Sequence, residues 1–170
     1  MNKYLASAYQ FGGIGGILSM VAFIILSFMR TDPTNLGLIF GYVITPISLF
    51  LAIKFFKEYT NNGFLSFSEG MSIGFVTYSL IALISGIGIW VVLLLSPVLF
   101  EEIKLSKLDV LQQNQETIIT QMGKESFEST LLNVQNMIPW DVAFNDAIWK
   151  VIPGLFFTII ISIILRKNPN

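Results

Sequence analysis

The side chains in this sequence that could do chemistry are mainly carboxylates. The chain has no His and no Cys. This excludes His-based acid–base catalysis, thiolate chemistry, disulfides and Cys/His metal sites. The carboxylate of most interest is Glu69, which stands at the start of a long apolar run. Because ionisable groups within a membrane are usually functional, a proton carrier is one interpretation of this residue.

Glu69 also has a structural interpretation, which we favour. Ser66 precedes it at the spacing of a capping box. In that motif the Ser66 hydroxyl accepts a hydrogen bond from the Glu69 amide, and the Glu69 carboxylate accepts one from the Ser66 amide. The helix dipole also stabilises a carboxylate at this position. We therefore expect a tight turn at Gly63, which tolerates positive φ, followed by the start of a helix.

The other acidic groups are better explained by structure than by catalysis. Glu101 and Glu102 are adjacent, and neighbouring residues on a helix point about 100° apart, so they do not share a site. Asp141, Asn145 and Asp146 could contribute to a cation site, but a hard cation needs about six oxygen ligands and no loop supplies them. We interpret Asn145 as the cap of the last apolar helix. The sequence predicts no catalytic residue, no metal site and no cofactor.

Composition predicts which elements carry these side chains. Of the 170 residues, 54% are hydrophobic and 12% are charged, and the mean hydropathy is +0.70. Soluble domains carry about 25% charged residues. The apolar residues fall in blocks that approach or exceed the roughly 18 residues of a membrane-spanning helix. The net charge of −1 offers no basic surface for nucleic acid. These properties predict an integral membrane protein.

The predicted fold is all-α, a polytopic membrane protein with four transmembrane helices in a single membrane domain over residues 1–170. Transmembrane helices are expected at about 11–29, 36–56, 67–95 and 147–165. A polar turn is expected at 30–35. An amphipathic helical hairpin is expected at about 101–146, with Gly123 ending its first helix. The apolar stripes of that hairpin should face each other, the membrane surface or a second subunit.

Glycines at helical spacing predict close packing between spans. Gly12 with Gly16, and Gly70 with Gly74, form small-xxx-small pairs, which let neighbouring helices approach closely. We expect these pairs to pack the first span against the third within one chain, and a face between two copies is the alternative. The glycines at 12–16 fit neither a dinucleotide-binding nor a P-loop pattern.

The Lys and Arg residues predict, by a margin of one charge, that both termini lie in the cytoplasm. This places the helical insert outside the cytoplasm. Lys124 is discounted because it lies far from either predicted span. The inner charges are Lys3, Lys54, Lys57, Arg166 and Lys167, and the outer ones are Arg30, Lys104, Lys107 and Lys150.

The order of these features resembles the bacterial membrane family catalogued as domain of unknown function family 4199. The resemblance rests on the element Gly-Phe-Leu-Ser-Phe-Ser-Glu-Gly at 63–70, followed by Gly74, and on Ser96-Pro97 ahead of Glu101-Glu102. It covers nearly the whole chain. The family name assigns no activity, so the resemblance carries over no catalytic residue.

Two classes of function follow from these features. The expected one is a non-enzymatic structural or protein-interaction component of a bacterial inner membrane, embedded in lipid and associating with itself or another membrane protein. The alternative is a small transporter or channel subunit for a neutral or lipid-like substrate. The middles of the predicted spans hold only Ser, Thr, Gly and Tyr as polar or small residues, which disfavours coupled ion transport. The residues of structural or functional interest are Ser66, Glu69, Gly70, Gly74, Gly12 and Gly16.

Overall fold

The computed structural model describes residues 3–29 and 33–168, and these are almost entirely helical. Four helices are long and apolar enough to cross a membrane. The predicted all-α, polytopic membrane fold is therefore confirmed. The turn predicted at 30–35 lies partly outside the described residues. The elements are α1 (Lys3–Phe28), α2 (Pro33–Phe55), the π-helix η1 (Phe56–Thr60), α3 (Phe67–Leu95), α4 (Pro97–Gln113), α5 (Gln115–Met122), α6 (Lys124–Gln135) and α7 (Pro139–Leu165).

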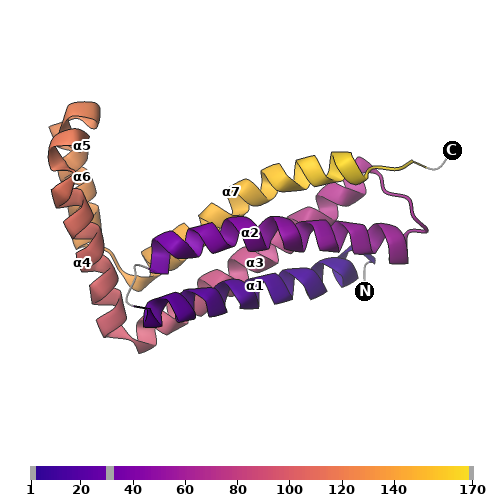
Figure 1. Cartoon of the computed structure of the whole chain (residues 1–170), viewed down its shortest axis with the longest axis horizontal. Helices are drawn as coiled ribbons and strands as arrows, with labels where there is room; N and C mark the ends of the chain where they lie inside the picture. Colours follow the sequence, from indigo (N-terminus) through magenta and orange to yellow (C-terminus); the bar gives the residue numbers. More distant parts are fainter. Residues whose placement is uncertain (1–2, 30–32, 169–170) are drawn as a thin grey trace.

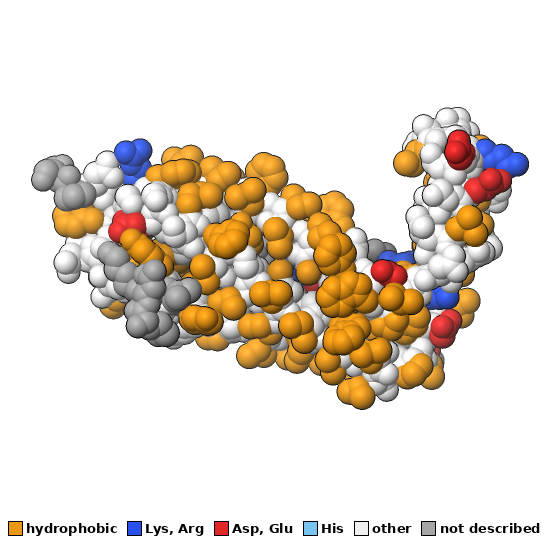
Figure 2. Space-filling model, turned by 180° about the vertical axis from the view of Figure 1, so that it is seen from behind, with side chains coloured by type: hydrophobic (Ala, Val, Ile, Leu, Met, Phe, Trp, Pro, Cys, Tyr) orange, Lys and Arg blue, Asp and Glu red, His pale blue; other side chains and the backbone are white. Residues whose placement is uncertain are grey.

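The four spanning helices, α1, α2, α3 and α7, form a bundle (Figure 1). The start of α1 and the end of α7 lie at the same end of this bundle. Helix α3 packs mainly against α1 and α7, while α2 packs against both of those helices from the other side. Hydrophobic side chains cover the visible flank of the bundle (Figure 2). Such a surface is stable against hydrocarbon, which is the environment that a spanning bundle meets.

The helices α4, α5 and α6 (residues 97–135) form an arm that stands across the axis of the bundle (Figure 1). We call this segment the arm. Its base is fixed, because Phe100 and Ile103 are buried in a cluster with Ile89 and Leu93 of α3. Within the arm, α6 packs against α4 and α5 and buries Phe127. The arm is therefore rooted in the bundle core and has a small apolar interior of its own.

The last span begins earlier than predicted. Helix α7 starts at Pro139, so the prediction that it begins near 145 or 147 with Asn145 as its cap is wrong. Proline is favoured at a first helical position, because its missing N–H would lack a partner there anyway. Asp141 supplies the capping carboxylate, with Oδ2 accepting from the Ile138 N–H at 2.8 Å. The additional turns bring Asp146 and Lys150 into the spanning helix.

The insert contains three helices, one more than the predicted hairpin. The first predicted helix is divided at Asn114 into α4 and α5. The Asn114 amide donates to the carbonyl of Val110 at 2.8 Å. Asn side chains compete in this way with backbone hydrogen bonds and favour helix ends. Gly123 does end α5 as predicted, with a φ of 86°.

The turn between η1 and α3 pairs with the segment that follows α7. Gly63 has a φ of 81°, as predicted, and Asn62 has a φ of 52°. The π-helix η1 ends where the Asn61 N–H donates to the carbonyl of Phe56 at 3.0 Å. Leu65 then pairs with Lys167 through two backbone hydrogen bonds of 2.9 Å. This bridge ties the segment after α7 to the entry of α3.

Candidate functional site

Ser66 and Glu69 form the capping box that their spacing predicts. The Ser66 Oγ accepts from the Glu69 N–H at 3.2 Å, and Glu69 Oε2 accepts from the Ser66 N–H at 2.9 Å. Asn61 also binds the Glu69 carboxylate, because its Nδ2 lies 3.4 Å from both carboxylate oxygens. The carboxylate thus satisfies donors at the first turn of α3 and at the preceding turn. This geometry supports the structural interpretation of Glu69.

Gly12 and Gly16 pack α1 against α3 within the chain. A Cβ at Gly12 would lie 3.0 Å from Leu80 Cβ, and one at Gly16 would lie 2.7 Å from Ile84 Cβ. Both distances are shorter than ordinary van der Waals contacts. The absence of a side chain therefore allows the close approach that the sequence predicts for the first and third spans.

Gly70 and Gly74 face a different helix from the one predicted. A Cβ at Gly70 would lie 2.5 Å from Ser162 Oγ, and one at Gly74 would lie 2.5 Å from Thr158 Oγ1. Both neighbours belong to α7, so the prediction that these glycines pack against the first span is wrong. The physical reason is that α3 lies between α1 and α7 and contacts them with different faces. Gly70 and Gly74 lie on the face that meets α7, while Leu80 and Ile84 lie on the face that meets α1.

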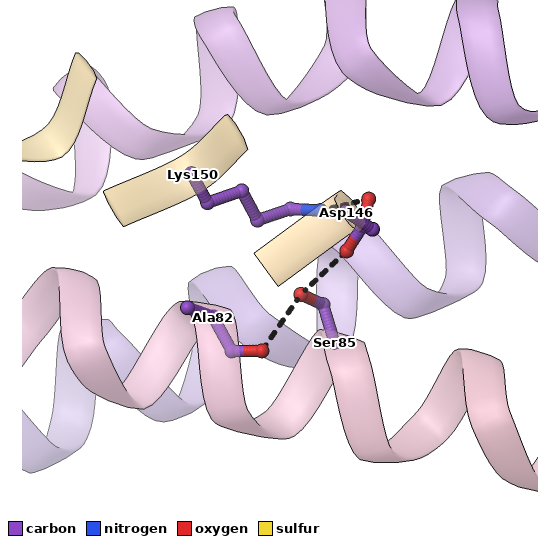
Figure 3. A network of polar contacts seen from close by, with 4 residues as sticks. All are labelled: Ala82, Ser85, Asp146 and Lys150. Carbon is purple, nitrogen blue, oxygen red and sulfur yellow. Dashed lines mark hydrogen bonds and ion pairs between the residues drawn. The ribbon is translucent and has the colours of Figure 1, made fainter. Parts of the chain in front are cut away.

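The bundle contains a polar cluster that the sequence did not predict (Figure 3). Lys150 forms an ion pair with Oδ1 of Asp146, one turn earlier on α7. The side chains are only 3% and 13% exposed, respectively. The Ser85 hydroxyl of α3 reaches the second carboxylate oxygen of Asp146 at 3.2 Å and the carbonyl of Ala82 at 3.4 Å. The cluster thus joins α3 to α7.

The cluster lies well within the spanning segment. At 1.5 Å per residue, Lys150 stands about 16 Å from the start of α7 in a helix about 40 Å long. Lys150 also faces α2, because a Cβ at Gly41 would lie 3.5 Å from its Cε. The interpretation that the span middles carry no charge is therefore wrong. It failed because the predicted span began at 147, which left Asp146 outside and Lys150 at the edge.

One signal in the sequence pointed to this pair. Asp146 and Lys150 are separated by four residues with the acid first, the favourable order for an ion pair on a helix. They are also the two charged residues in a stretch, Val142 to Leu165, that is otherwise uncharged and mostly apolar. Buried charges in such a run are stable when they neutralise each other and retain hydrogen bonds. Counted as a mutually neutralising pair, Asp146 and Lys150 are compatible with a spanning helix that begins before residue 146.

An apolar groove lies between α3 and α7, on the same turns as the polar cluster. It has a volume of about 450 Å³. Small residues line its floor, including Ala82, Gly86 and Ala147, and its rim carries Trp140 and Phe144. Such a surface can hold hydrocarbon, and Ser79 is the one hydroxyl-bearing residue among those that line it.

The remaining acidic candidates do not assemble into a site. Glu101 and Glu102 are exposed at the base of the arm. Among the described residues, no three acidic side chains gather as metal ligands would. The arrangement best suited to chemistry is therefore the buried pair of Asp146 and Lys150 with Ser85, which can hold or pass a proton.

Comparison with known proteins places the chain in a family. The model of the family described as Protein of unknown function (DUF4199) matches residues 10–167, so the chain belongs to that family. No curated protein and no solved structure gives a significant match. The match covers the four spanning helices and the arm together, and the family description assigns no activity.

Proposed function

We propose that this member of the DUF4199 family is a non-enzymatic component of a bacterial inner membrane that holds its arm against a partner protein at the membrane surface. The observation that carries the proposal is the rooted arm. Phe100 and Ile103 anchor it in the bundle core, and it stands across the bundle axis. In a bilayer the arm would lie along the membrane surface, where a neighbouring protein can reach it.

The chemistry of the arm indicates the kind of partner. It carries six acidic and three basic residues. Apolar side chains are exposed between them, namely Leu105, Val110, Met122 and Leu132. Interfaces combine an apolar centre with a charged rim, so a partner with a basic, partly apolar face would be complementary. A second copy of this acidic arm would be repelled at the rim.

Charge distribution supports an arm outside the cytoplasm. Lys150 is buried in α7 and no longer counts as a loop charge, while Lys124 lies about 15 residues from the true start of α7 and does count. The tally becomes five inner charges against four outer ones. This preserves the predicted orientation with the termini in the cytoplasm.

Single cysteines test the orientation cleanly, because the chain has no native Cys. In intact cells a membrane-impermeant maleimide should label Gln121→Cys in the arm but not Asn168→Cys near the C-terminus. Labelling of Asn168→Cys alone would reverse the orientation. Both variants should react equally after the cells are lysed, which controls for exposure.

Photocrosslinking tests the association. A crosslinking amino acid at Leu132 of the arm should give one protein adduct in native membranes, and the same amino acid at the exposed bundle position Leu83 should give none. Reversing the charges of Glu125 and Glu128 should weaken that adduct. Equal adducts from both positions, or an adduct that ignores the charge reversal, would contradict an arm-specific partner.

A transporter or channel subunit is the second candidate, and one observation favours it. Ionisable residues within a membrane typically mark ion or substrate pathways, and Asp146 and Lys150 are such residues. The adjacent apolar groove fits the lipid-like part of that hypothesis. Neither feature requires the arm, so the two candidates can be tested separately.

A further inference from the structure

Buried polar residues are distributed through the mainly apolar interior of the bundle, and every spanning helix contributes some of them. The buried polar residues are Ser7 and Ser19 of α1, Thr45 and Ser48 of α2, Thr77 and Ser85 of α3, and Lys150, Thr158 and Ser162 of α7. Four of their hydroxyls have no hydrogen-bond partner among the described residues, namely those of Ser7, Ser19, Thr45 and Ser162. An unpaired buried hydroxyl is unfavourable, so such groups call for an explanation.

At the arm end, a narrow cleft leads to the ion pair. It has a volume of about 10 Å³ and is lined in part by Thr34, Asn145 and Asp146. That volume is about the room that one water molecule needs. The Thr34 hydroxyl at its edge accepts from Lys107 Nζ of the arm at 3.0 Å. Water on the arm side can therefore approach the Asp146 carboxylate past Thr34 and Asn145, while Phe23, Leu38 and Val142 line the rest of the cleft.

Beyond the ion pair, hydroxyls continue towards the other end of the bundle. Lys150 lies against Gly41, and Thr45 is one turn further along the same face of α2. A Cβ at Gly15 would lie 2.6 Å from Ser48 Oγ. Because α1 and α2 run antiparallel, Ser19 lies level with Thr45, one turn from that contact. The ion pair is thus followed by a group of hydroxyls in the middle of the bundle.

The ion pair is the main ionisable group on this path, and the ionisable residues nearest to it are Tyr78 and Lys107. Tyr78 of α3 packs against Gly154, one turn beyond Lys150 on α7. Lys107 of α4 lies at the mouth of the cleft. Facing the pair, α3 presents Ser85, α2 presents Thr34, Leu38 and Gly41, and α1 presents Phe23. A proton that enters from the arm end therefore meets Asp146 first.

We propose that the bundle interior conducts protons, with Asp146 and Lys150 as its exchange site. A proton from arm-side water binds the Asp146 carboxylate, which loosens the ion pair. The Lys150 ammonium releases one proton to the hydroxyl and water path beyond, and the neutral amine then takes the proton from the Asp146 acid. One proton enters and one leaves, so the site returns to its starting state. This inference rests on the second candidate function, a transporter or channel subunit, and names protons rather than a neutral or lipid-like molecule as what it conducts.

Proton flux into vesicles tests the proposal. The purified full chain is reconstituted into vesicles of mixed phosphatidylethanolamine and phosphatidylglycerol, loaded with K⁺ and a pH-sensitive dye. Valinomycin then lets K⁺ leave, and the resulting potential draws protons inwards. We expect faster acidification than in protein-free vesicles. A rate equal to that of protein-free vesicles would overturn the proposal.

Variants separate the exchange site from the fold. The double variant Asp146→Asn/Lys150→Met removes both charges together, so no buried charge is left unpaired, and its flux should fall to that of protein-free vesicles. Asp141→Asn is the matched control, because it changes an exposed acid on the same helix and should keep the wild-type flux. Wild-type flux in the double variant would overturn the role of the pair.

Thr45→Val provides a second test that does not disturb the ion pair. It keeps the side-chain shape and removes a hydroxyl without a partner among the described residues, so the fold should be unaffected. A lower flux than wild type at equal helicity supports the path. An unchanged flux would show that protons do not pass Thr45. Crosslinking of the arm reports separately on the first candidate function, so failure of one does not imply failure of the other.

Discussion

Replacing Lys150 by Met tests how strongly the buried ion pair contributes to stability. Met is similar in length and apolar, so it fills the space but leaves the Asp146 carboxylate without its cation. Removing one partner of a buried pair costs about 3–5 kcal/mol. Because the two side chains are only 3% and 13% exposed, water screens this loss little. We therefore expect a loss of about that size in the free energy of unfolding.

The double variant and Ser85 complete the test. Removing both charges with Asp146→Asn/Lys150→Met should leave stability within about 1 kcal/mol of wild type, since neutral replacements of buried pairs are often tolerated. Ser85→Ala removes a 3.2 Å hydrogen bond between two spanning helices. Such bonds in membranes contribute about 0.6 kcal/mol and at most about 1.7 kcal/mol. The single charge variant should therefore lose the most stability, and Ser85→Ala and the double variant should each lose much less.

The assay is a titration of mixed detergent micelles with SDS, followed by far-UV circular dichroism. A double-mutant cycle gives the coupling between Asp146 and Lys150 directly. The reasoning would be refuted by additive losses, because two independent residues do not form a pair. A harmless Lys150→Met variant would equally contradict it, since the carboxylate would then not need its cation.

Three further predictions concern the packing, the cap and the arm. Gly74→Ala should destabilise the bundle by about 1–3 kcal/mol, because its Cβ would lie 2.5 Å from Thr158 Oγ1, and Thr158→Gly should restore stability in that background. Ser66→Ala should cost about 1 kcal/mol in unfolding free energy through loss of the cap, whereas Glu69→Gln should retain most of it. Phe127→Ala should increase hydrogen exchange in α6 while the bundle keeps its protection, because Phe127 is buried within the arm.

Controls for these predictions lie within the same chain. Gly13→Ala is the matched control for the packing test, because a Cβ there would meet nothing within 4 Å, and stability should not fall. Equal stability of the two alanine variants would contradict the close contact between α3 and α7. Loss of folded protein in Glu69→Gln would show that the charge itself is required. Loss of protection throughout the bundle in Phe127→Ala would show that the arm and bundle unfold together.

Local properties of the chain were sufficient to predict most of the fold. Apolar runs long enough to cross a bilayer predicted four spans, since backbone groups in hydrocarbon must bond within their own helix. The start of α3 was also predictable, because the Ser66 and Glu69 hydrogen bonds join residues three apart. The positive φ of Gly63 and Gly123 followed from local turn chemistry.

The start of α7 shows where local reasoning fails. Asp146 and Lys150 lower the hydropathy of the segment when each is counted alone, so the sequence placed the span boundary between them. In the folded chain the two charges offset each other, and Ser85 of α3 binds the carboxylate. The favourable terms come from a partner on the next turn and a residue 61 positions away in the chain. A hydropathy sum over single residues includes neither of these two contributions.

The sequence by itself determined that this chain crosses a membrane four times, where α3 begins, and which glycines allow close helix contact. Only the tertiary structure decided which helices those glycines meet, because that depends on the position of α3 between α1 and α7. The tertiary structure also decided that the interior of the bundle holds an ion pair together with hydroxyls that have no hydrogen-bond partner among the residues the structure describes. Side chains from four separate helices converge there, and their distances are set by helix packing rather than by spacing along the chain.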